Sequence, residues 1–178
     1  MTRLGFLSGL ILVMAASVAA PCRADEPAVV NARQVAGLFM QSCLQFAGDK
    51  NGLRAWAKNT KLQELPPTGQ DIFLHGLPGL VFDASTKDGK FVLVSEDGGS
   101  CSVLAETASG TAVVSDLEKN LNEAQITFKI TADRDDAVEK ALRHREYTAT
   151  KGDRGWLLLV STVKDQVGGE AMLTANRY

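Results

Sequence analysis

The chain has 178 residues, of which 45% are hydrophobic, and its formal net charge is −2. This composition is typical of a globular protein, and the length is enough to bury one hydrophobic core. The slightly acidic balance argues against a nucleic-acid partner, because such a partner calls for a basic surface.

The first 24 residues have the pattern of a secretory signal peptide. A short basic start, MTR, precedes the apolar run LGFLSGLILVMAASVAA, and small residues lead to Ala24 just before Asp25. Signal peptidase recognises small residues at such a site. We therefore expect residues 1–24 to be removed and residues 25–178 to fold as a single domain in the periplasm. No transmembrane anchor is expected after cleavage, because the longest later apolar run, WLLLV, has the length of a strand.

Cys22 leaves an alternative open in this segment. A cysteine just after an apolar signal can become the acylated first residue of a lipoprotein. Pro21, directly before it, suits that processing poorly, so ordinary cleavage is the preferred interpretation. The cleaved chain then keeps two cysteines, Cys43 and Cys101, and an even pair in an oxidising compartment predicts a disulfide bond.

Two helices are expected first along the chain. Apolar residues recur at helical spacing in segment 31–48, with Asn31 as a plausible N-cap and Gly48 as the C-terminal stop. This spacing places Cys43 on the buried face of the first helix. A shorter second helix is expected at 51–59.

Three strands are expected next. The segment DIFLHGLPGLVFDAS predicts a loop or lid that leads into a strand at 80–84. The Asp-Gly of TKDGK marks a hairpin turn before a strand at 91–96, and DGG turns the chain into a third strand at 101–106. These strands form an antiparallel meander.

The second half predicts two further helices and four strands. A helix at 109–124, capped by Thr111, precedes a strand at 126–130. A helix at 131–145 is expected because acidic residues lie at its start and Arg143, His144 and Arg145 at its end, as the helix dipole favours. Strands are expected at 146–150, 156–162 and 170–178.

These strands differ in their expected positions. The continuous apolar run of strand 156–162 predicts a central strand covered on both faces, and strand 170–178 is expected at an edge. The element order is two helices, three strands, a helix, a strand, a helix and three strands. It predicts an α+β fold with two N-terminal helices and a mostly antiparallel sheet that has helices packed on one face.

No motif for a metal, a phosphate or another cofactor is present, so none is expected. One possible nucleophile is Cys101, with His75 as its base and the backbone N–H groups of Gly98 and Gly99 as oxyanion donors. A disulfide with Cys43 is preferred over that arrangement. A catalytic acid pair is also conceivable, drawn from acids at expected turns and strand ends: Asp83, Glu96, Asp97 and Glu106.

A possible binding loop lies between the helical and sheet regions. Phe73, His75, Leu77 and Pro78 make it apolar. Such a loop either plugs the core or contacts a protein partner or small ligand in the cell envelope.

Three stretches of the chain resemble segments of a family of small exported proteobacterial proteins of unknown function. These are REYTATKGDRGWLLLVST followed by EAMLTA, then GGSCSVLA, and then CLQFAGDKNGLRAW. The resemblance covers most of the chain after the signal and includes both cysteines. It implies an envelope protein and brings no activity, cofactor or catalytic residue.

The preferred function is that of a soluble, disulfide-linked periplasmic protein that works by binding, as an accessory or inhibitor-type protein. The chain has two histidines and lacks metal and phosphate motifs, so few parts for catalysis are present. The alternative is a small envelope hydrolase that uses Cys101 with His75 or an acid pair.

Overall fold

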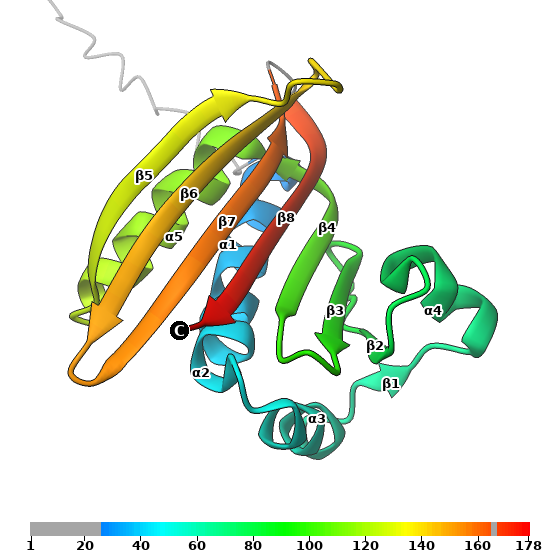
Figure 1. Cartoon of the computed structure of the whole chain (residues 1–178). Helices are drawn as coiled ribbons and strands as arrows, with labels where there is room; N and C mark the ends of the chain where they lie inside the picture. The colour runs from blue at the N-terminus through cyan, green and yellow to red at the C-terminus, as the bar shows by residue number, and fades with distance from the viewer. Residues whose placement is uncertain (1–25, 165–166) are drawn as a thin grey trace, which may run out of the picture.

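The chain forms a helix followed by an antiparallel meander, and it does so twice (Figure 1). The structure is a computed structural model that describes residues 26–164 and 167–178. The first half comprises α1 (Pro27–Gln41), α2 (Cys43–Phe46), α3 (Lys50–Asn59), β1 (Gln63–Glu64), α4 (Pro67–Leu74), β2 (Gly79–Asp83), β3 (Phe91–Glu96) and β4 (Cys101–Ser109). The second half comprises α5 (Gly110–Glu123), β5 (Thr127–Asp135), β6 (Leu142–Lys151), β7 (Arg154–Val163) and β8 (Val167–Arg177).

The strands of the described residues join one antiparallel sheet in the order β1-β2-β3-β4-β8-β7-β6-β5. This order is symmetric, because β1 to β4 run from one edge of the sheet to its centre and β5 to β8 run from the other edge to the centre. β4 and β8 pair antiparallel at the centre, with Val103 opposite Leu173, so an approximate two-fold axis passes between them. The helices α1 and α5 contact each other on one face of the sheet, here called the inner face (Figure 1). The predicted α+β class is therefore confirmed.

The main core lies between these two helices and the inner face. Val35 and Phe39 of α1 recur at helical spacing and are fully buried, as are Val103 and Leu173 on the central strands. From α5, the fully buried residues are Val113, Leu117 and Leu121. Burying one side chain of this size stabilises the fold by about 1.5–3 kcal/mol, so the interior contacts hold the two halves together.

The first helix differs from the prediction at both ends. It begins at Pro27, a residue that suits the first helical turn, so Asn31 is not its N-cap. Asn31 is instead buried inside the helix, where its Nδ2 donates a hydrogen bond to the Thr107 carbonyl oxygen at 2.9 Å. The helix is interrupted before Gly48, at Ser42, whose hydroxyl donates to the Leu38 carbonyl oxygen at 2.6 Å.

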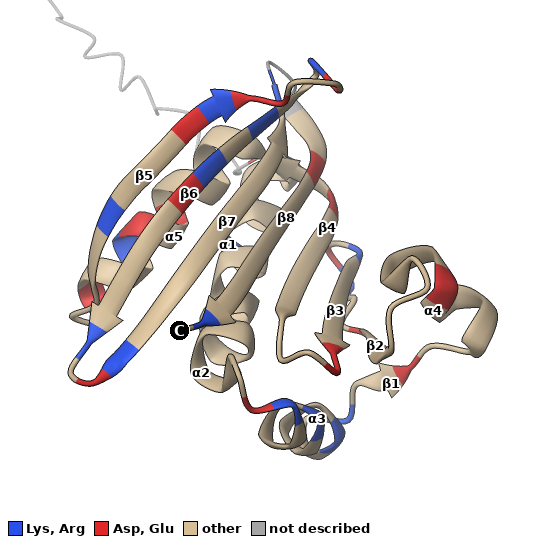
Figure 2. Ribbon diagram, in the orientation of Figure 1, with Lys and Arg blue, Asp and Glu red and all other residues tan. Residues whose placement is uncertain are grey.

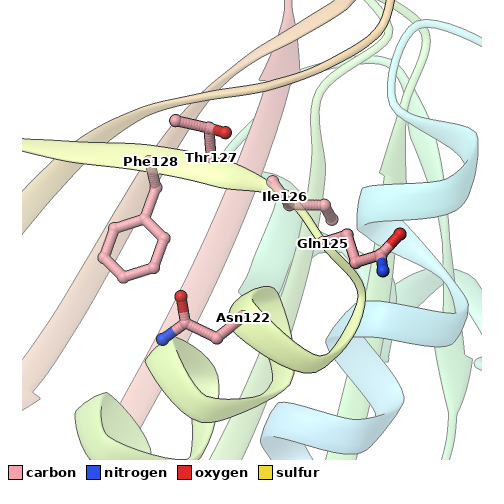
Figure 3. Close-up of a pocket in the computed structure, with 5 residues that line it drawn as sticks. All are labelled: Asn122, Gln125, Ile126, Thr127 and Phe128. Carbon is pink, nitrogen blue, oxygen red and sulfur yellow. The ribbon is translucent and has the colours of Figure 1, made fainter.

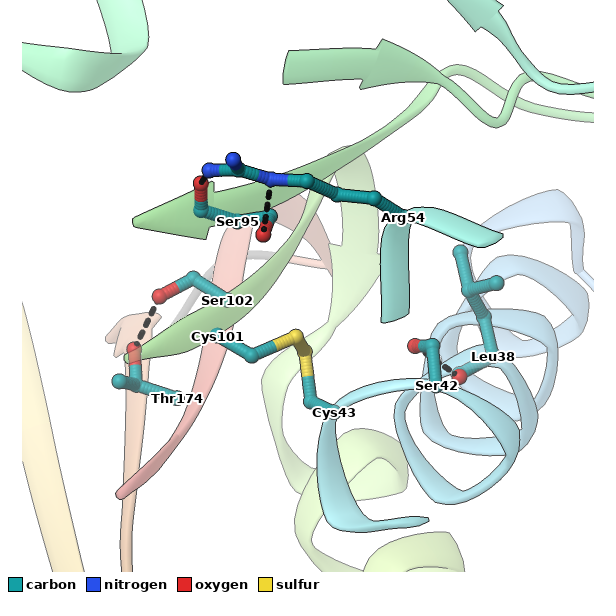
Figure 4. The surroundings of a disulfide bond; sticks show 8 residues. All are labelled: Leu38, Ser42, Cys43, Arg54, Ser95, Cys101, Ser102 and Thr174. Atoms are coloured by element: carbon teal, nitrogen blue, oxygen red, sulfur yellow. Dashed lines mark hydrogen bonds between the residues drawn. A yellow bond between two sulfur atoms is a disulfide. The ribbon is translucent and has the colours of Figure 1, made fainter. Parts of the chain in front are cut away.

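The predicted disulfide between Cys43 and Cys101 is confirmed (Figure 4). It joins α2 to the first residue of β4, and both cysteines are buried. Close by, Arg54 of α3 donates to the Ser95 hydroxyl of β3 at 3.1 Å (Figure 4). The N-terminal helices are thus attached to the sheet by a covalent bond and by charge-assisted hydrogen bonds.

The prediction of a helix at 131–145 is wrong. β5 continues to Asp135 and β6 begins at Leu142, so this segment forms most of a hairpin. The charged residues that were assigned to the two ends of a helix form ion pairs between the two strands instead. Asp133 lies directly opposite Arg145, and its Oδ2 accepts from Arg145 Nη2 at 2.6 Å. Side chains along a strand alternate between its two faces, and Tyr147 and Ala149 of β6 are therefore both buried on the inner face.

Two positional predictions in the sheet are also wrong. Strand 170–178 was expected at an edge, yet β8 lies between β4 and β7. β7 is central as expected, but only its inner face is fully covered. Trp156 and Leu158 are buried there, while Leu157 on the opposite, outer face is 48% exposed. A long apolar run therefore does not require two covered faces.

We expect Cys43→Ser and Cys101→Ser to lower the free energy of unfolding by similar amounts, because each removes the same bond. The bond spans 58 residues, and a loop of that size is expected to contribute roughly 4 kcal/mol in the chain-entropy account. Urea denaturation with and without reductant measures this loss. Reductant should destabilise the wild type and leave Cys43→Ser unchanged, and a further loss in that variant would contradict the prediction.

Candidate functional site

The disulfide removes the proposed thiol nucleophile. Cys101 is bonded to Cys43 and is 1% exposed, so it has no free thiolate for His75 to generate. His75 lies at the end of α4 with a left-handed φ of 49°. Gly99, with a φ of +92°, forms the turn between β3 and β4. The Cys101 and His75 hypothesis is therefore wrong.

The acids proposed as a catalytic pair include two with lowered pKa values. Asp97 accepts from Arg54 Nη2 at 2.7 Å, and this hydrogen bond is the main cause that lowers the pKa of Asp97. The hydrogen bond from Ser85 likewise lowers the pKa of Asp83. A general acid at neutral pH needs a raised pKa. Asp83 and Asp97 therefore lack the environment for that role.

The predicted binding loop belongs to a segment, residues 63–80, that we call the α4 arm. Where a loop was expected, residues 67–74 form α4. Its Leu74 is buried on the outer face of the sheet, in a small cluster with Val81 and Val94. Phe73 packs partly against this cluster. The expected loop therefore contains a helix that is anchored to the sheet.

Other side chains of the α4 arm face solvent, whereas Leu65 and Leu80 are half-buried against the core clusters. His75 and Pro78 are exposed, and Leu77 is 54% exposed. Ile72, which sequence reasoning did not single out, is 66% exposed. Both alternatives for the predicted loop therefore apply to parts of the same segment. Leu74 is buried and anchors the arm, whereas Ile72 and Leu77 are available for contact.

The α4 arm also has a distinct charge. No Lys or Arg occurs between Lys61 and Lys87. Glu64 and Asp71 are exposed, and Figure 2 shows acidic but no basic colouring on β1 and α4. The arm is therefore both apolar and acidic.

A second feature is a groove of about 590 Å³ at the start of α5, here called the α5 groove. The first turn of the helix and the inner face of β5, β6 and β7 line it. The N-cap is Ser109 rather than the expected Thr111. Gly110 lies so close to β7 that a Cβ atom would be 2.9 Å from the Cβ of Thr162. A larger residue at 110 would push the helix away from the sheet.

Charged side chains form a network along one wall of the α5 groove. Asp133 accepts from Arg143 Nε at 2.7 Å and from Arg145 Nη2 at 2.6 Å. These hydrogen bonds, that of Arg143 first, lower the pKa of Asp133 to about 2. Arg145 also donates to Glu118 of α5 at 3.1 Å. Figure 2 shows the alternating charges along β5 and β6.

The network continues into the core through a tyrosine. The hydroxyl of Tyr147 donates to Glu118 at 2.9 Å. Burial, and then the neighbouring Glu118 carboxylate, raise the pKa of Tyr147, so its hydroxyl stays protonated. Because Glu118 accepts from both strand residues, it fixes α5 against β6.

A third feature is a hydrogen-bonded chain of Ser161, His144 and Asp136. His144 Nδ1 lies 2.8 Å from the Ser161 hydroxyl, and Nε2 lies 2.8 Å from Asp136 Oδ2. Asp136 Oδ1 also accepts the backbone N–H groups of Val138 and Glu139, and these bonds are the main cause that lowers its pKa to about 2. The residue types are those of a serine hydrolase triad.

The position of Ser161 favours a structural role for these hydrogen bonds. Ser161 lies within β7, directly opposite His144 of β6, and is 7% exposed. A serine nucleophile in a hydrolase commonly lies on an exposed strand-to-helix turn beside free backbone N–H groups. Here the hydrogen bonds of His144 to Ser161 and Asp136 instead hold the turn after β5 against the sheet. His144 was expected at a helix end, which concealed this contact.

A smaller hollow of about 430 Å³ lies where α5 ends and β5 begins (Figure 3). Its lining contains no charged side chain. In Figure 3, Asn122 and Phe128 face one another across it, whereas Gln125 points away. The hollow therefore offers few groups that could select a ligand.

The described residues contain neither a metal-binding cluster nor a membrane-spanning helix. Among residues 26–164 and 167–178, no three His, Cys, Asp or Glu side chains are grouped to hold a metal ion. No helix in these ranges is both long and apolar enough to cross a membrane. The predicted signal peptide and Cys22 lie outside the described residues.

No family model, curated protein or solved structure matches the chain, and the resemblance to an exported family stays a prediction.

We expect Asp133 to make stability depend on acid pH. Its pKa falls from 3.8 to about 2 on folding, so its contribution is present above pH 4 and is lost as the pH falls toward 2. Chemical denaturation across this window should show a smaller change for Asp133→Asn than for the wild type. Asp153→Asn, in the turn between β6 and β7, is the control and should behave as the wild type. Equal slopes for all three proteins would contradict the prediction.

We expect Ser161 to be unreactive toward a fluorophosphonate probe, because it is buried within a strand. Ser161→Ala should cost about 1 kcal/mol of stability through the lost hydrogen bond to His144. Mass spectrometry of the probe-treated protein tests the first expectation and thermal unfolding the second. Stoichiometric labelling of Ser161 would instead identify a hydrolase.

Proposed function

We propose that the protein is exported to the periplasm and works there by binding another protein through the α4 arm. The signal-like residues 1–24 support export. A disulfide between two buried cysteines also suits an oxidising compartment. The proposed role is that of an accessory or inhibitor-type protein without catalysis of its own.

The observation that carries this proposal is the exposure of two large apolar side chains on an anchored helix and its following turn. Ile72 is 66% exposed and Leu77 is 54% exposed. Single exposed apolar residues are common, but a pair on one short, projecting segment offers a contact surface. Because Leu74 fixes α4 to the sheet, the pair is held in place before a partner binds, which lowers the entropy cost of association.

The charge of the α4 arm indicates what kind of partner it would bind. Glu64 and Asp71 carry negative charge, and no basic residue lies between Lys61 and Lys87. A complementary protein surface would have an apolar centre with Lys or Arg at its rim. Such charges speed association and suppress wrong partners more than they strengthen binding.

The catalytic alternative has less support. Cys101 is bonded to Cys43, so the thiol mechanism is excluded. The lowered pKa values of Asp83 and Asp97 favour ionised carboxylates rather than a general acid. A binding role makes no such demand on these residues.

We expect the double variant Ile72→Ser, Leu77→Ser to lose a partner that the wild type captures from an envelope extract. Immobilised wild type, double variant and a control would be cross-linked in the same extract and compared by quantitative mass spectrometry. The control is Val138→Ser, because Val138 is 92% exposed in the turn between β5 and β6, away from the arm. Melting temperatures confirm that all three proteins are folded.

The expected partner is recovered with the wild type and Val138→Ser but not with the double variant, and its binding weakens with added salt. Equal recovery by all three proteins would show that the arm is not the contact surface. Failure to recover any protein in repeated experiments would count against the binding function itself.

A further inference from the structure

We propose that the α5 groove binds a small organic anion that has a carboxylate or phosphate head and a short apolar body. The α5 groove lies on the inner face of the second half of the chain, whereas the α4 arm belongs to the first half. The inference therefore goes beyond the proposed protein contact and does not depend on it.

Thr162 supplies the first observation. It is 8% exposed and lines the groove beside Gly110. Its hydroxyl makes no hydrogen bond in the part of the chain that the structure describes. A ligand oxygen in the groove would give this hydroxyl a partner.

Arg143 supplies the second observation. Its Nε donates to Asp133 at 2.7 Å, which fixes the plane of the guanidinium group. Its two terminal nitrogens make no hydrogen bond within residues 26–164 and 167–178, and its side chain is 49% exposed. A guanidinium group held at one edge presents its remaining donors in a fixed geometry to a carboxylate or phosphate. Asp133 is thus a positioning residue for Arg143.

The start of α5 supplies the third observation. The first N–H groups of a helix have no carbonyl partner within the helix, and they carry partial positive charge. α5 has 14 residues, and its Gly110 and Thr111 line the groove. This helix start and the Thr162 hydroxyl both belong to the groove lining, so an anion there would meet donors from two elements.

The ion pairs around the groove nearly balance one another. Arg143 and Arg145 face Asp133, Arg145 also reaches Glu118, and Lys164 donates to Asp135 at 2.8 Å. The unmatched positive potential therefore comes from the helix start and from the spare donors of Arg143. This balance predicts binding of one anionic group rather than of a polyanion.

The remaining lining and the volume indicate the rest of the ligand. Val114, Val160 and Val163 make part of the groove apolar. Its volume of about 590 Å³ lies within the range of sites that hold small molecules. An inorganic ion would leave the apolar part unfilled, so a head group with a hydrocarbon body fits better.

Titration of the purified chain at low salt with hexyl phosphate, hexanoate, inorganic phosphate and hexanol tests the proposal by NMR chemical shifts. We expect saturable binding of hexyl phosphate or hexanoate, weaker binding of inorganic phosphate, and no saturation by hexanol. The tighter of the two organic anions identifies the preferred head group. The shifted signals should belong to residues 109–114 and 160–164.

Variants assign the binding to the α5 groove. We expect Arg143→Gln to weaken binding about tenfold, since one charge-assisted interaction is lost. Thr162→Val, which keeps the side-chain shape, should weaken it by roughly threefold to tenfold. Arg134→Gln is the matched control and should bind as the wild type, because Arg134 pairs with Glu146 at 2.6 Å on the outer face of the same hairpin.

Equal affinity of Arg143→Gln, Thr162→Val and the wild type would overturn the proposal. So would the absence of saturable binding of either organic anion up to about 10 mM. If inorganic phosphate bound as tightly as hexyl phosphate, the proposal that the ligand has an apolar body would be wrong. The variants leave the α4 arm unchanged, so failure here is separate from failure of the protein contact.

Discussion

The antiparallel pairing of β4 with β8 is the contact on which the rest of the structure depends. It joins two meanders into one sheet, and Ser102 and Thr174 share a hydrogen bond of 2.8 Å across it (Figure 4). α1 packs against both of these strands. A meander of three or four strands has too little surface to bury a helix of this length completely. Each half therefore relies on the other to cover its helix.

The α5 groove follows from a mismatch of lengths. α5 has 14 residues and is about 21 Å long, whereas the ten residues of β6 extend for about 33 Å. The strands therefore continue beyond the helix, and charged side chains replace apolar ones near the helix start. Asp133 and Arg143 line the groove there, while Arg145 reaches Glu118 of α5. Regular secondary structure alone thus produces a polar recess beside a helix start.

Local chemistry made part of the fold predictable. Asp-Gly in TKDGK and the glycines of DGGS located the turns of the first meander, and the parity of the remaining cysteines gave the bond between Cys43 and Cys101. The segment 131–145 was predicted wrongly because opposite charges at its two ends suit a helix and a hairpin equally well. Only the alternation that buries Tyr147 and Ala149 separates the two, and it begins after the charged residues.

The positions of strands and sites could not be predicted in the same way. The residues that flank β8 come from β4, about seventy positions earlier, and from β7, so no local pattern shows that β8 is central. The α5 groove likewise combines one helix end with three strands. Of the candidate site residues, Phe73, His75, Leu77 and Pro78 were singled out because apolar residues surround a turn, and their role in binding stays a prediction. Ile72 was missed, since on a helix its exposure depends on which face packs.

The central position of β8 also affects the order in which the protein can fold. β8 follows the other described strands along the chain, so β4 and β7 each lack a neighbour until residues 167–177 are available. Pairing over such sequence separations is slow. Cys43 and Cys101 both precede the second half, so their bond can form while that half is still unfolded. A chain that crosses a membrane in an unfolded state would benefit from this delay, because its sheet cannot close before its last strand arrives.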